Sequence, residues 1–388
     1  MPFYHKLGEL PPVKHTTFYK PDGTSLYREE LVSSKGFSGI YSTVYHHELP
    51  NSMKAYKDLK LASAELWTEA PTLYMHSDTD KHKESGNFVT ARRTYLENAG
   101  CKISIAHVDE DSEIFYRNVR AAEFIFIHHG AGVLYSQFGK NPFGPGDQIV
   151  VPRGTIYRMS FEDLDQVKLV IVESDTAFEI PKHYKNDNGQ MAEHAPYCER
   201  DFRPPEYTEP ILEKGEYPLI LKADDRYTEH TLVNHPFDVV GWDGYLYPFT
   251  FNIKNFHPKV GRIHLPPPVH LLYTTASFVV CNFVPRPFDF HEKAIPAPYF
   301  HNNIDSDEVL YYLDGDFMSR KGVVSGSLTF HPGGITHGPQ PGRTEDSIGV
   351  EKTEEYALMI DTFSPLKPTT ALQASLLDDY YRSWMPND

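Results

Sequence analysis

The chain has 388 residues and a net charge of −16 at pH 7, from 53 acidic and 37 basic side chains. Nucleic acid and anionic membranes repel an acidic protein of this kind, so we expect neither as a partner. No apolar run reaches the roughly 18 residues of a membrane-spanning helix, and the sequence MPFYHKLGELPP lacks the basic and apolar regions of a signal peptide. We therefore expect a cytoplasmic protein whose Cys101, Cys198 and Cys281 are free thiols.

Short runs of β-branched and aromatic residues, separated by turns, predict a mainly β protein. The 31 Pro and 25 Tyr fit strands and turns better than long helices. The length favours two domains, which we place at residues 1–225 and 226–388. Residues 51–70 fit either a short helix or a connecting arm, and the polar, Pro-rich residues 181–225 fit a linker or an arm that wraps a neighbour.

The N-terminal domain contains two strand-like runs, residues 124–128 and 148–152. The turns Gly146-Asp147 and Arg153-Gly154-Thr155 flank the second run. The paired histidines His128 and His129 end the first run. These features predict a small β-barrel in this half of the chain.

Residues 301–338 carry the strongest chemical signal. His301 precedes Glu308 by seven positions, and His337 closes a motif that starts at Gly326, GSLTFHPGGITH. Two histidines and one carboxylate are the ligand set of mononuclear non-haem iron sites. The runs EVLYYL and SLTF between them predict two strands of one barrel, which would bring the three side chains together.

The end of the chain has apolar residues at helical spacing. Leu372, Leu376, Leu377 and Tyr380 fall on one face of a helix over residues 370–384. The pattern predicts a C-terminal helix that covers the barrel or a neighbouring subunit.

These motifs resemble the two-part cupin signature, H…E(x)6G followed by G(x)5PxGxxH. Pro332, Gly334 and His337 match its second part, while the first part is relaxed, because His301 stands alone where the signature has HxH. The earlier block also resembles the second part, but Tyr157 takes the histidine position, and no glutamate stands at the right place after His128 and His129. The resemblance implies two cupin-like barrels or jelly rolls, and we expect the N-terminal one to be degenerate and to bind no metal.

Longer segments resemble the homogentisate 1,2-dioxygenase family. They are HHGAGVLYSQFGKNPFGPGDQIVVPRGT, DVVGWDGYLYPFTFNIKNF, HNNIDSDE and HPGGITHGP. The resemblance implies an enzyme that uses O2 to open the ring of homogentisate, a small aromatic diphenol, giving maleylacetoacetate in tyrosine and phenylalanine breakdown. It also implies trimers, with hexamers as paired trimers.

The same resemblance implies roles by position. His301, Glu308 and His337 fall on the Fe(II) ligands, and His264 falls on the acid/base histidine that acts on the substrate hydroxyl. His331 and His337 fall in the substrate pocket. Phe317 takes the place of a tyrosine that contacts substrate in the animal enzymes.

Two departures from the family leave alternatives open. The interval from His301 to the glutamate is one residue longer than in the animal enzymes, so Asp307 competes with Glu308; we prefer Glu308, because its spacing to Gly315 keeps the strand in register. The missing hydroxyl at Phe317 removes a hydrogen bond of about 1 kcal/mol. Gentisate or hydroquinone therefore remain alternative substrates, with a non-enzymatic metal-binding cupin and a zinc isomerase as further alternatives. Tyr311, Tyr312, Arg286 or Arg320 could substitute for the missing tyrosine, and the sequence leaves open which residue holds the substrate carboxylate.

Overall fold

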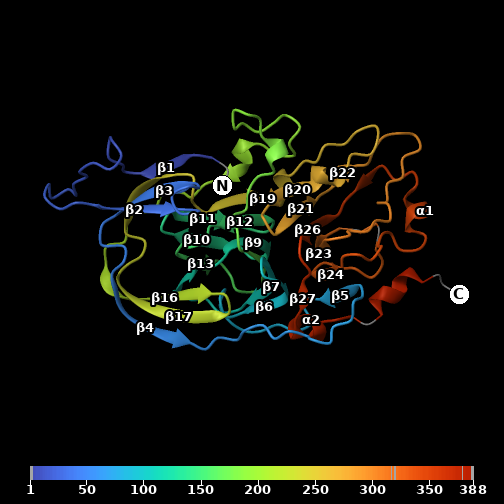
Figure 1. Ribbon diagram of the computed structural model, residues 1–388, viewed down its shortest axis with the longest axis horizontal. Coiled ribbons are helices and arrows are strands. Elements are labelled where there is room, and N and C mark those ends of the chain that lie inside the picture. Colours follow the sequence, from blue (N-terminus) through green and yellow to red (C-terminus); the bar gives the residue numbers. More distant parts are fainter. Residues whose placement is uncertain (1–2, 316, 319, 378, 386–388) are drawn as a thin grey trace.

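The computed structural model describes residues 3–315, 317–318, 320–377 and 379–385. The strands gather into two units that lie side by side, on the left and right of Figure 1. The mainly β fold expected from the composition is confirmed. Helices are few and short: α1 (Arg343–Ser347), α2 (Thr370–Ala374), and the 3₁₀ segments η1 (Lys182–Tyr184), η2 (Glu199–Asp201), η3 (Ile253–Asn255), η4 (Pro267–His270) and η5 (Tyr380–Trp384).

The first barrel is built from two facing sheets. One sheet has the order β11 (Gly139–Phe143), β10 (Gly132–Ser136), β13 (Tyr157–Phe161), β8 (Phe115–Asn118), β16 (Lys214–Ala223), β17 (Arg226–Asn234) and β4 (Met53–Leu59). The other has the order β15 (Phe202–Arg203), β19 (Phe249–Asn252), β12 (Asp147–Val151), β9 (Ala122–His129), β14 (Val167–Ser174), β7 (Cys101–Val108), β6 (Arg92–Glu97) and β27 (Lys367–Pro368). Ile125 and Ile171 on this sheet, and Leu134 and Met159 on the facing one, belong to the core between them.

The second barrel centres on a six-stranded sheet. Its order is β20 (Leu271–Thr274), β21 (Phe278–Phe283), β26 (Tyr356–Thr362), β23 (Asp307–Asp314), β24 (Ser327–His331) and β5 (Met75–Asp78). A short ladder of β22 (Arg286–Pro287) and β25 (Lys352–Thr353) lies beside it.

The eight-stranded sheet is buried on both faces, and this joins the two barrels. Side chains of a strand alternate between the faces, so Ile125 and Ile171 fill the core of the first barrel while Phe124 and Val172 enter a second core. That second core also contains Val309 and other residues of the six-stranded sheet. Burial on both faces explains why β14 reads VKLVIVES without an exposed position.

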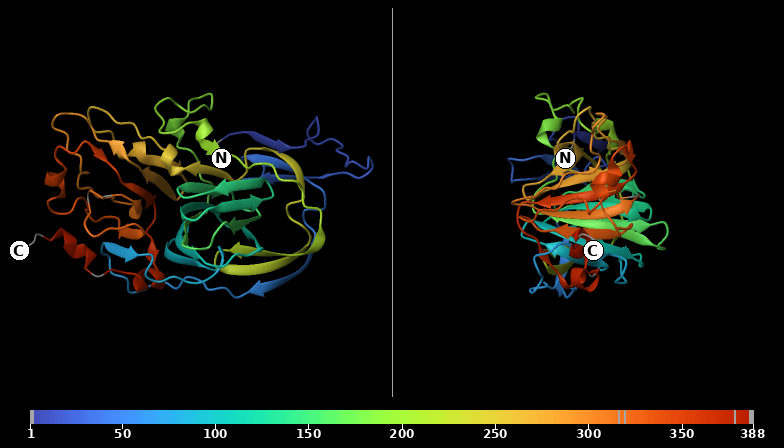
Figure 2. Two further views of the ribbon diagram at one scale, coloured as in Figure 1. Left: turned by 180° about the vertical axis from the view of Figure 1, so that it is seen from behind. Right: turned by 90° about the vertical axis from the view of Figure 1, so that its right-hand side faces the viewer.

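Each barrel also takes a strand from the distant end of the chain. β5 pairs with β24 of the second barrel, and β27 pairs with β6 of the first. In Figure 2, β5 is the blue arrow beside the red strands of the second barrel. Residues 60–74 form an arm that runs from β4 to β5 (Figure 1). The helix considered for residues 51–70 is wrong, because residues 53–59 pair with β17 as an edge strand.

The expected boundary near residue 225 falls in the turn between β16 and β17. These two strands pair with each other along most of their length. Both belong to the seven-stranded sheet of the first barrel.

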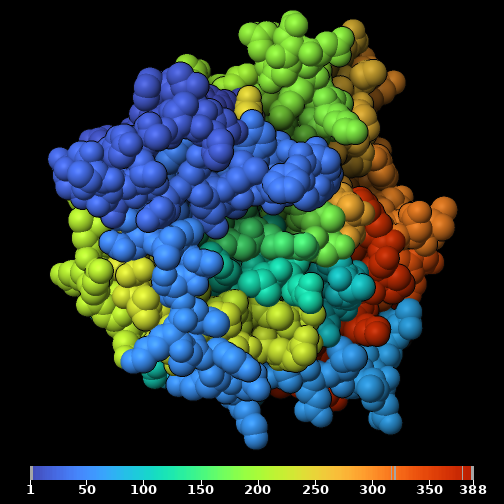
Figure 3. Space-filling view, turned by 60° about the vertical axis from the view of Figure 1, so that its left-hand side comes forward, coloured from blue at the N-terminus to red at the C-terminus, as the bar shows by residue number. Residues whose placement is uncertain are grey.

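The N-terminal segment covers the outside of the first barrel. It contributes β1 (His5–Gly8), β2 (Arg28–Ser33) and β3 (Tyr41–His46) to a four-stranded sheet that is completed by β18 (Val239–Gly244). Figure 3 shows this segment in dark blue over the green strands, with the lighter blue arm below it.

The single C-terminal helix expected over residues 370–384 is wrong. The segment forms α2 and η5, which are separate. Between them, Leu376 bridges to Ser77, and the Leu377 backbone N–H donates to the carbonyl of His76 at 2.8 Å. Pairing with β5 therefore replaces the helical hydrogen bonds that the spacing of apolar residues favoured.

Cys101, Cys198 and Cys281 are free thiols. No helix among the described residues is both long and apolar enough to cross a bilayer.

Candidate metal centre

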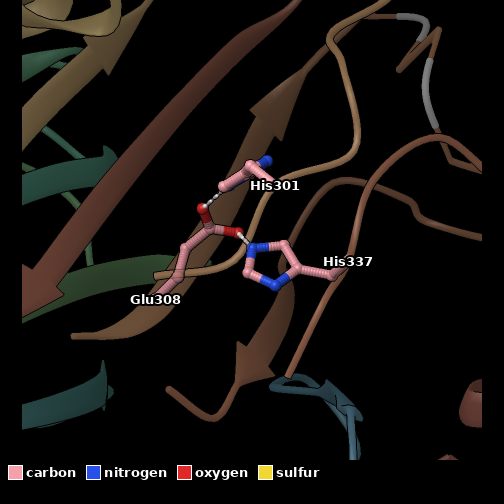
Figure 4. A group of neighbouring side chains, drawn as sticks. All are labelled: His301, Glu308 and His337. Atoms are coloured by element: carbon pink, nitrogen blue, oxygen red, sulfur yellow. Dashed lines mark hydrogen bonds and ion pairs between the residues drawn. The ribbon is translucent and has the colours of Figure 1, made fainter. Parts of the chain in front are cut away.

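His301, Glu308 and His337, hereafter the metal triad, converge at one end of the second barrel. Glu308 is the second residue of β23, whereas His301 and His337 lie in the loops before β23 and after β24. The backbones of the two histidines form a two-way bridge, His301 N–H to His337 O at 2.8 Å and His337 N–H to His301 O at 2.9 Å. The imidazole centroids lie 4.3 Å apart, with His301 above and His337 beside the carboxylate of Glu308 (Figure 4).

The donor atoms of the metal triad all face one point. One ligand atom from each residue lies within 4.8 Å of the other two. His301 Nε2 is 3.4 Å from Glu308 Oε2, and His337 Nε2 is 3.4 Å from Glu308 Oε1. Each Nδ1 instead faces a backbone carbonyl two residues earlier, Tyr299 O at 3.3 Å and Ile335 O at 3.0 Å. A proton on Nδ1 leaves the Nε2 lone pair directed at the centre, which is the tautomer of a metal-binding histidine.

The electrostatics of this arrangement fit a bound cation. Burial favours the neutral acid, but the contacts with His301, His331 and His337 outweigh it and hold the pKa of Glu308 well below its usual range. A carboxylate anion thus faces two imidazole lone pairs, an arrangement that a divalent cation or a proton stabilises. The hydrogen bond with Glu308 raises the pKa of His301, so protons compete for the same position. Nitrogen and oxygen donors of this kind suit iron, and they also suit zinc and manganese.

His331 is hydrogen-bonded to Glu308. Its side chain is fully buried, and Nδ1 lies 2.7 Å from Glu308 Oε1. Burial lowers the pKa of His331 to about 4, so the neutral ring donates this hydrogen bond from Nδ1. The ring also stacks on His337, with centroids 4.7 Å apart. His331 therefore fixes the orientation of two members of the metal triad.

Asp307 faces away from the metal triad. Its Oδ1 accepts a hydrogen bond from the Gly333 backbone at 2.7 Å, and its Oδ2 accepts one from the Leu366 backbone at 2.6 Å. Neighbouring strand residues point to opposite faces, so one of Asp307 and Glu308 can face the histidines. In the observed register of β23, Glu308 is the residue that faces the histidines.

His264 lies at the rim of the centre. Its side chain is 59% exposed, and Nδ1 is 3.0 Å from Asp289 Oδ2. Its ring meets the edge of Tyr299 with centroids 5.3 Å apart, and Tyr299 is the residue whose carbonyl holds His301. His264 was predicted from the sequence, whereas Asp289 and Tyr299, which give the ring its orientation, stand in no motif that would signal them.

Phe317 and Arg320 lie in the segment that follows β23. The Phe317 ring is buried against Tyr312, with centroids 4.6 Å apart. Arg320 is also buried and donates to the carbonyl of Gly338, the residue after His337, at 2.5 Å. Its guanidinium lies 5.4 Å from the centroid of the Trp384 ring.

The other residues considered for the substrate carboxylate have partners elsewhere. The Tyr311 hydroxyl lies 2.6 Å from Nδ1 of His128 in the first barrel. The Tyr312 hydroxyl lies 3.3 Å from Thr329 Oγ1. Arg286 packs beside Phe288. Arg320, by contrast, contacts the residue that follows His337.

Aromatic residues from both ends of the chain contact the histidines, and the sequence reasoning missed them. Tyr74, the last residue of the arm, lies 5.7 Å from His331 and 6.4 Å from His337, measured between ring centroids. Tyr380 stacks on His331 at 6.3 Å, and Trp384 packs on Tyr74 at 4.9 Å. These side chains reach the centre because β5 and the C-terminal segment pair beside β24.

Asp361 is a further acidic residue at the centre that the sequence reasoning missed. It lies opposite Glu308 in the pairing of β23 with β26. Burial and the negative charge of Glu308 raise the pKa of Asp361 to about 8. The strand register alone brings the two carboxyl groups together, and no local motif signals it.

Two sequence comparisons bear on the family. Residues 67–253 match the family described as Homogentisate 1,2-dioxygenase N-terminal. A protein of Saccharolobus solfataricus named "Putative dioxygenase" is 39% identical over 389 residues, covering 99% of both chains. The homogentisate 1,2-dioxygenase of Bradyrhizobium diazoefficiens is 25% identical over 395 residues, covering 92% of this chain and 86% of that enzyme.

A comparison with solved structures gives a more distant likeness. A cupin 2 conserved barrel domain protein from Leptotrichia buccalis is 12% identical, with a TM-score of 0.33. The match covers 78% of this chain and 100% of that protein.

Proposed function

Because the chain belongs to the homogentisate dioxygenase-like family of cupin proteins, we propose that it is an Fe(II)-dependent ring-cleaving dioxygenase. The proposed reaction converts homogentisate and O2 to maleylacetoacetate, as a step of tyrosine and phenylalanine breakdown. The observation that carries the proposal is the metal triad, in which one buried carboxylate faces two imidazole Nε2 atoms at 3.4 Å.

In this proposal, His301, Glu308 and His337 hold the iron. Ferrous iron with open coordination positions supplies the redox chemistry that lets O2 react with an aromatic diphenol. The carbonyls of Tyr299 and Ile335 keep both imidazoles in the binding tautomer, and His331 keeps the carboxylate turned toward them. Tyr74, Tyr380 and Trp384 shield the buried side of the site from water.

His264 moves the proton of the substrate hydroxyl. Asp289 holds Nδ1 at 3.0 Å, so Nε2 is the atom that accepts the proton. A carboxylate behind the ring orients the imidazole, as in other enzymes with a histidine base. The exposed rim position gives the ring access to an entering substrate and a route for the proton to solvent.

Arg320 holds the carboxylate of homogentisate. The chain is acidic overall, so an anionic substrate needs a local cation. Arg320 is a buried cation beside the His337 loop and the Trp384 ring. Arg320→Lys should raise the KM for homogentisate and leave the KM for hydroquinone, which has no carboxylate, unchanged. An equal change for both substrates would remove Arg320 from this role.

The direct test is oxygen consumption by the Fe(II)-loaded protein with homogentisate, gentisate and hydroquinone in parallel. Rapid uptake with homogentisate, together with the absorbance of an enol-dione product, is the expected result. Uptake with another diphenol alone would keep the ring-cleaving chemistry and change the substrate. Bound iron without uptake on any of the three would favour a binding protein, and zinc in the purified protein with no uptake would favour an isomerase.

We also propose that copies of the chain assemble through the loops around the metal centre. Five large apolar side chains there are strongly exposed: Ile263 70%, Phe290 69%, Ile295 58%, Phe300 60% and Ile304 83%. Exposed apolar groups gathered in one region mark association surfaces. Light scattering should give the mass of a trimer or hexamer, and Ile304→Asp should lower it. A monomer at micromolar concentration would contradict the proposal.

A further inference from the structure

The two barrels repeat one strand plan. In the first, six neighbouring strands have the order β6-β7-β14-β9-β12-β19, and in the second the order is β20-β21-β26-β23-β24-β5. If the first five strands of each series are numbered in the order in which they occur along the chain, their order within the sheet is 1-2-5-3-4 in both barrels. The sixth position is taken by β19 in one barrel and by the borrowed β5 in the other. Equivalent positions can therefore be compared directly.

The sequence spacing of the metal triad recurs in the first barrel. Tyr116 precedes Glu123 by seven residues and Gly130 follows after seven more, as His301, Glu308 and Gly315 do. The second motif recurs as well, with Gly146, Pro152, Gly154 and Tyr157 spaced like Gly326, Pro332, Gly334 and His337. No glutamate follows His128 and His129 at the required spacing, as expected, but Glu123 stands before them at the position that corresponds to Glu308.

The backbone follows the same repeat. The φ angles of the paired glycines agree within a few degrees: Gly130 101° and Gly315 104°, Gly146 88° and Gly326 83°, Gly154 81° and Gly334 79°. All three positions are left-handed, a conformation that glycine adopts without strain. The turns that present the metal triad are thus present in both barrels.

Strand pairing gives the same equivalence independently. Tyr116 pairs with Tyr157, as His301 pairs with His337. Glu123 lies opposite Glu173, as Glu308 lies opposite Asp361. Tyr116, Glu123 and Tyr157 therefore occupy the three positions of the metal triad.

The side chain of Arg92, in β6, lies among these three residues. Its guanidinium donates to Glu123 Oε1, and to the Tyr157 hydroxyl at 2.8 Å. Both tyrosine hydroxyls donate to the same carboxylate, Tyr157 at 2.6 Å and Tyr116 at 3.2 Å. We propose that the first barrel holds a closed counterpart of the metal centre, in which the Arg92 guanidinium takes the place of the metal cation.

The charges of this arginine cluster (Arg92, Tyr116, Glu123 and Tyr157) parallel those of the metal triad. Glu123 is 1% exposed. Burial favours its neutral form, but Arg92 and the Tyr157 hydroxyl outweigh this and lower the pKa of Glu123. Burial raises the pKa of both tyrosines well above the ordinary value, so they remain neutral hydroxyls and are weak metal ligands. A cation attached to the chain cannot dissociate, and its planar fork fits the carboxylate and the hydroxyl together.

If the Arg92 side chain is removed, we expect the vacated position to bind a planar guanidinium ion. In Arg92→Ala the buried Glu123 loses its cation, and the melting temperature should fall by about 5–10 °C. Methylguanidinium at millimolar concentration should recover at least half of that loss, while lowering or not changing the melting temperature of the unaltered protein. Arg92→Lys, which keeps a charge at the position, should fold and should not respond to methylguanidinium.

Arg93→Ala is the matched control. Arg93 is the next residue of β6, and it contacts the carbonyl of His82 and the carboxylate of Glu84 outside the cluster. Its variant should not respond to methylguanidinium. If Arg92→Ala is recovered unfolded, the same comparison is made on refolding yield. Absence of a selective effect of methylguanidinium on Arg92→Ala, in melting temperature or in yield, would overturn the proposal.

A second measurement tests the equivalence with a metal site. Arg92→Ala combined with Tyr116→His and Tyr157→His places imidazoles where the metal triad has them. In a background that carries His301→Ala and His337→Ala, the folded protein should bind one Zn²⁺ per chain after dialysis, and the background alone should bind none. A folded variant that retains no zinc would show that the two sites are not equivalent.

Discussion

The two barrels share a strand order, three left-handed glycines and a buried glutamate, yet they present opposite sites. In the second barrel, Glu308 lies between two histidines, and the His301 side chain is 32% exposed. In the first barrel, Glu123 lies between two tyrosines that are 0% exposed, and Arg92 closes the space. In both cases, therefore, the barrel supplies a carboxylate at a fixed point. The two flanking residues and the access to solvent decide whether the compensating cation comes from outside.

The largest difference between the barrels should appear on truncating equivalent residues. His337→Ala removes a ligand atom, so metal content and oxygen uptake should both fall to background. Tyr157→Phe, at the equivalent position, should leave both unchanged. Metal analysis and an oxygen electrode check this pair, and a His337→Ala variant with normal turnover would contradict the site.

A rim residue of the second barrel should affect turnover alone. His264→Ala removes the proton acceptor, and general acid–base catalysis contributes on the order of 10²–10⁴ in rate. Metal content should stay at the level of the unaltered protein, because His264 is at the rim and bonds to Asp289. Turnover at the normal rate would refute the acid/base role.

The two equivalent glutamates should differ in what they stabilise. Glu123→Gln leaves the buried Arg92 charge unpaired, which should cost about 3–5 kcal/mol of unfolding free energy. Glu308→Gln should cost metal binding instead, with a smaller loss of stability in the metal-free protein. Urea denaturation of both variants without metal, beside metal analysis, separates the two effects. Similar profiles for the two variants would remove the distinction between the barrels.

Asp307 should behave as a structural residue. Asp307→Asn weakens its hydrogen bonds with the Gly333 and Leu366 backbones and should cost about 1–3 kcal/mol, while metal content stays constant. Loss of metal in Asp307→Asn, with retention in Glu308→Gln, would move the ligand by one residue.

The smallest effect should come from one of the hydrogen bonds between the barrels. Tyr311→Phe removes the hydroxyl that lies 2.6 Å from His128 Nδ1. Such a bond contributes about 0.5–1.5 kcal/mol, so the variant should melt a few degrees lower with unchanged turnover per bound metal. A change in turnover would indicate coupling between the two barrels.

Local motifs predicted the parts of this molecule that depend on nearby residues. The spacing of His301, Glu308 and His337 predicted their convergence, because each lies next to one of two adjacent strands. The sequence did not reveal Tyr74 or Trp384 as residues of the site. They reach the centre because β5 and the C-terminal segment, which are hundreds of residues apart from each other in the chain, come together beside β24. Asp361 depends on strand register in the same way. The C-terminal helix was wrong because backbone pairing of Leu376 and Leu377 with the β5 strand replaces helical hydrogen bonds.

The most direct test of the account is the rate of homogentisate-dependent oxygen uptake against iron bound per chain. We expect a rate that rises in proportion to iron and reaches its maximum at one Fe(II) per chain, with Arg92 keeping the first barrel closed to metal. Two bound irons per chain would contradict the closed first barrel. Uptake that does not depend on iron would contradict the metal centre itself.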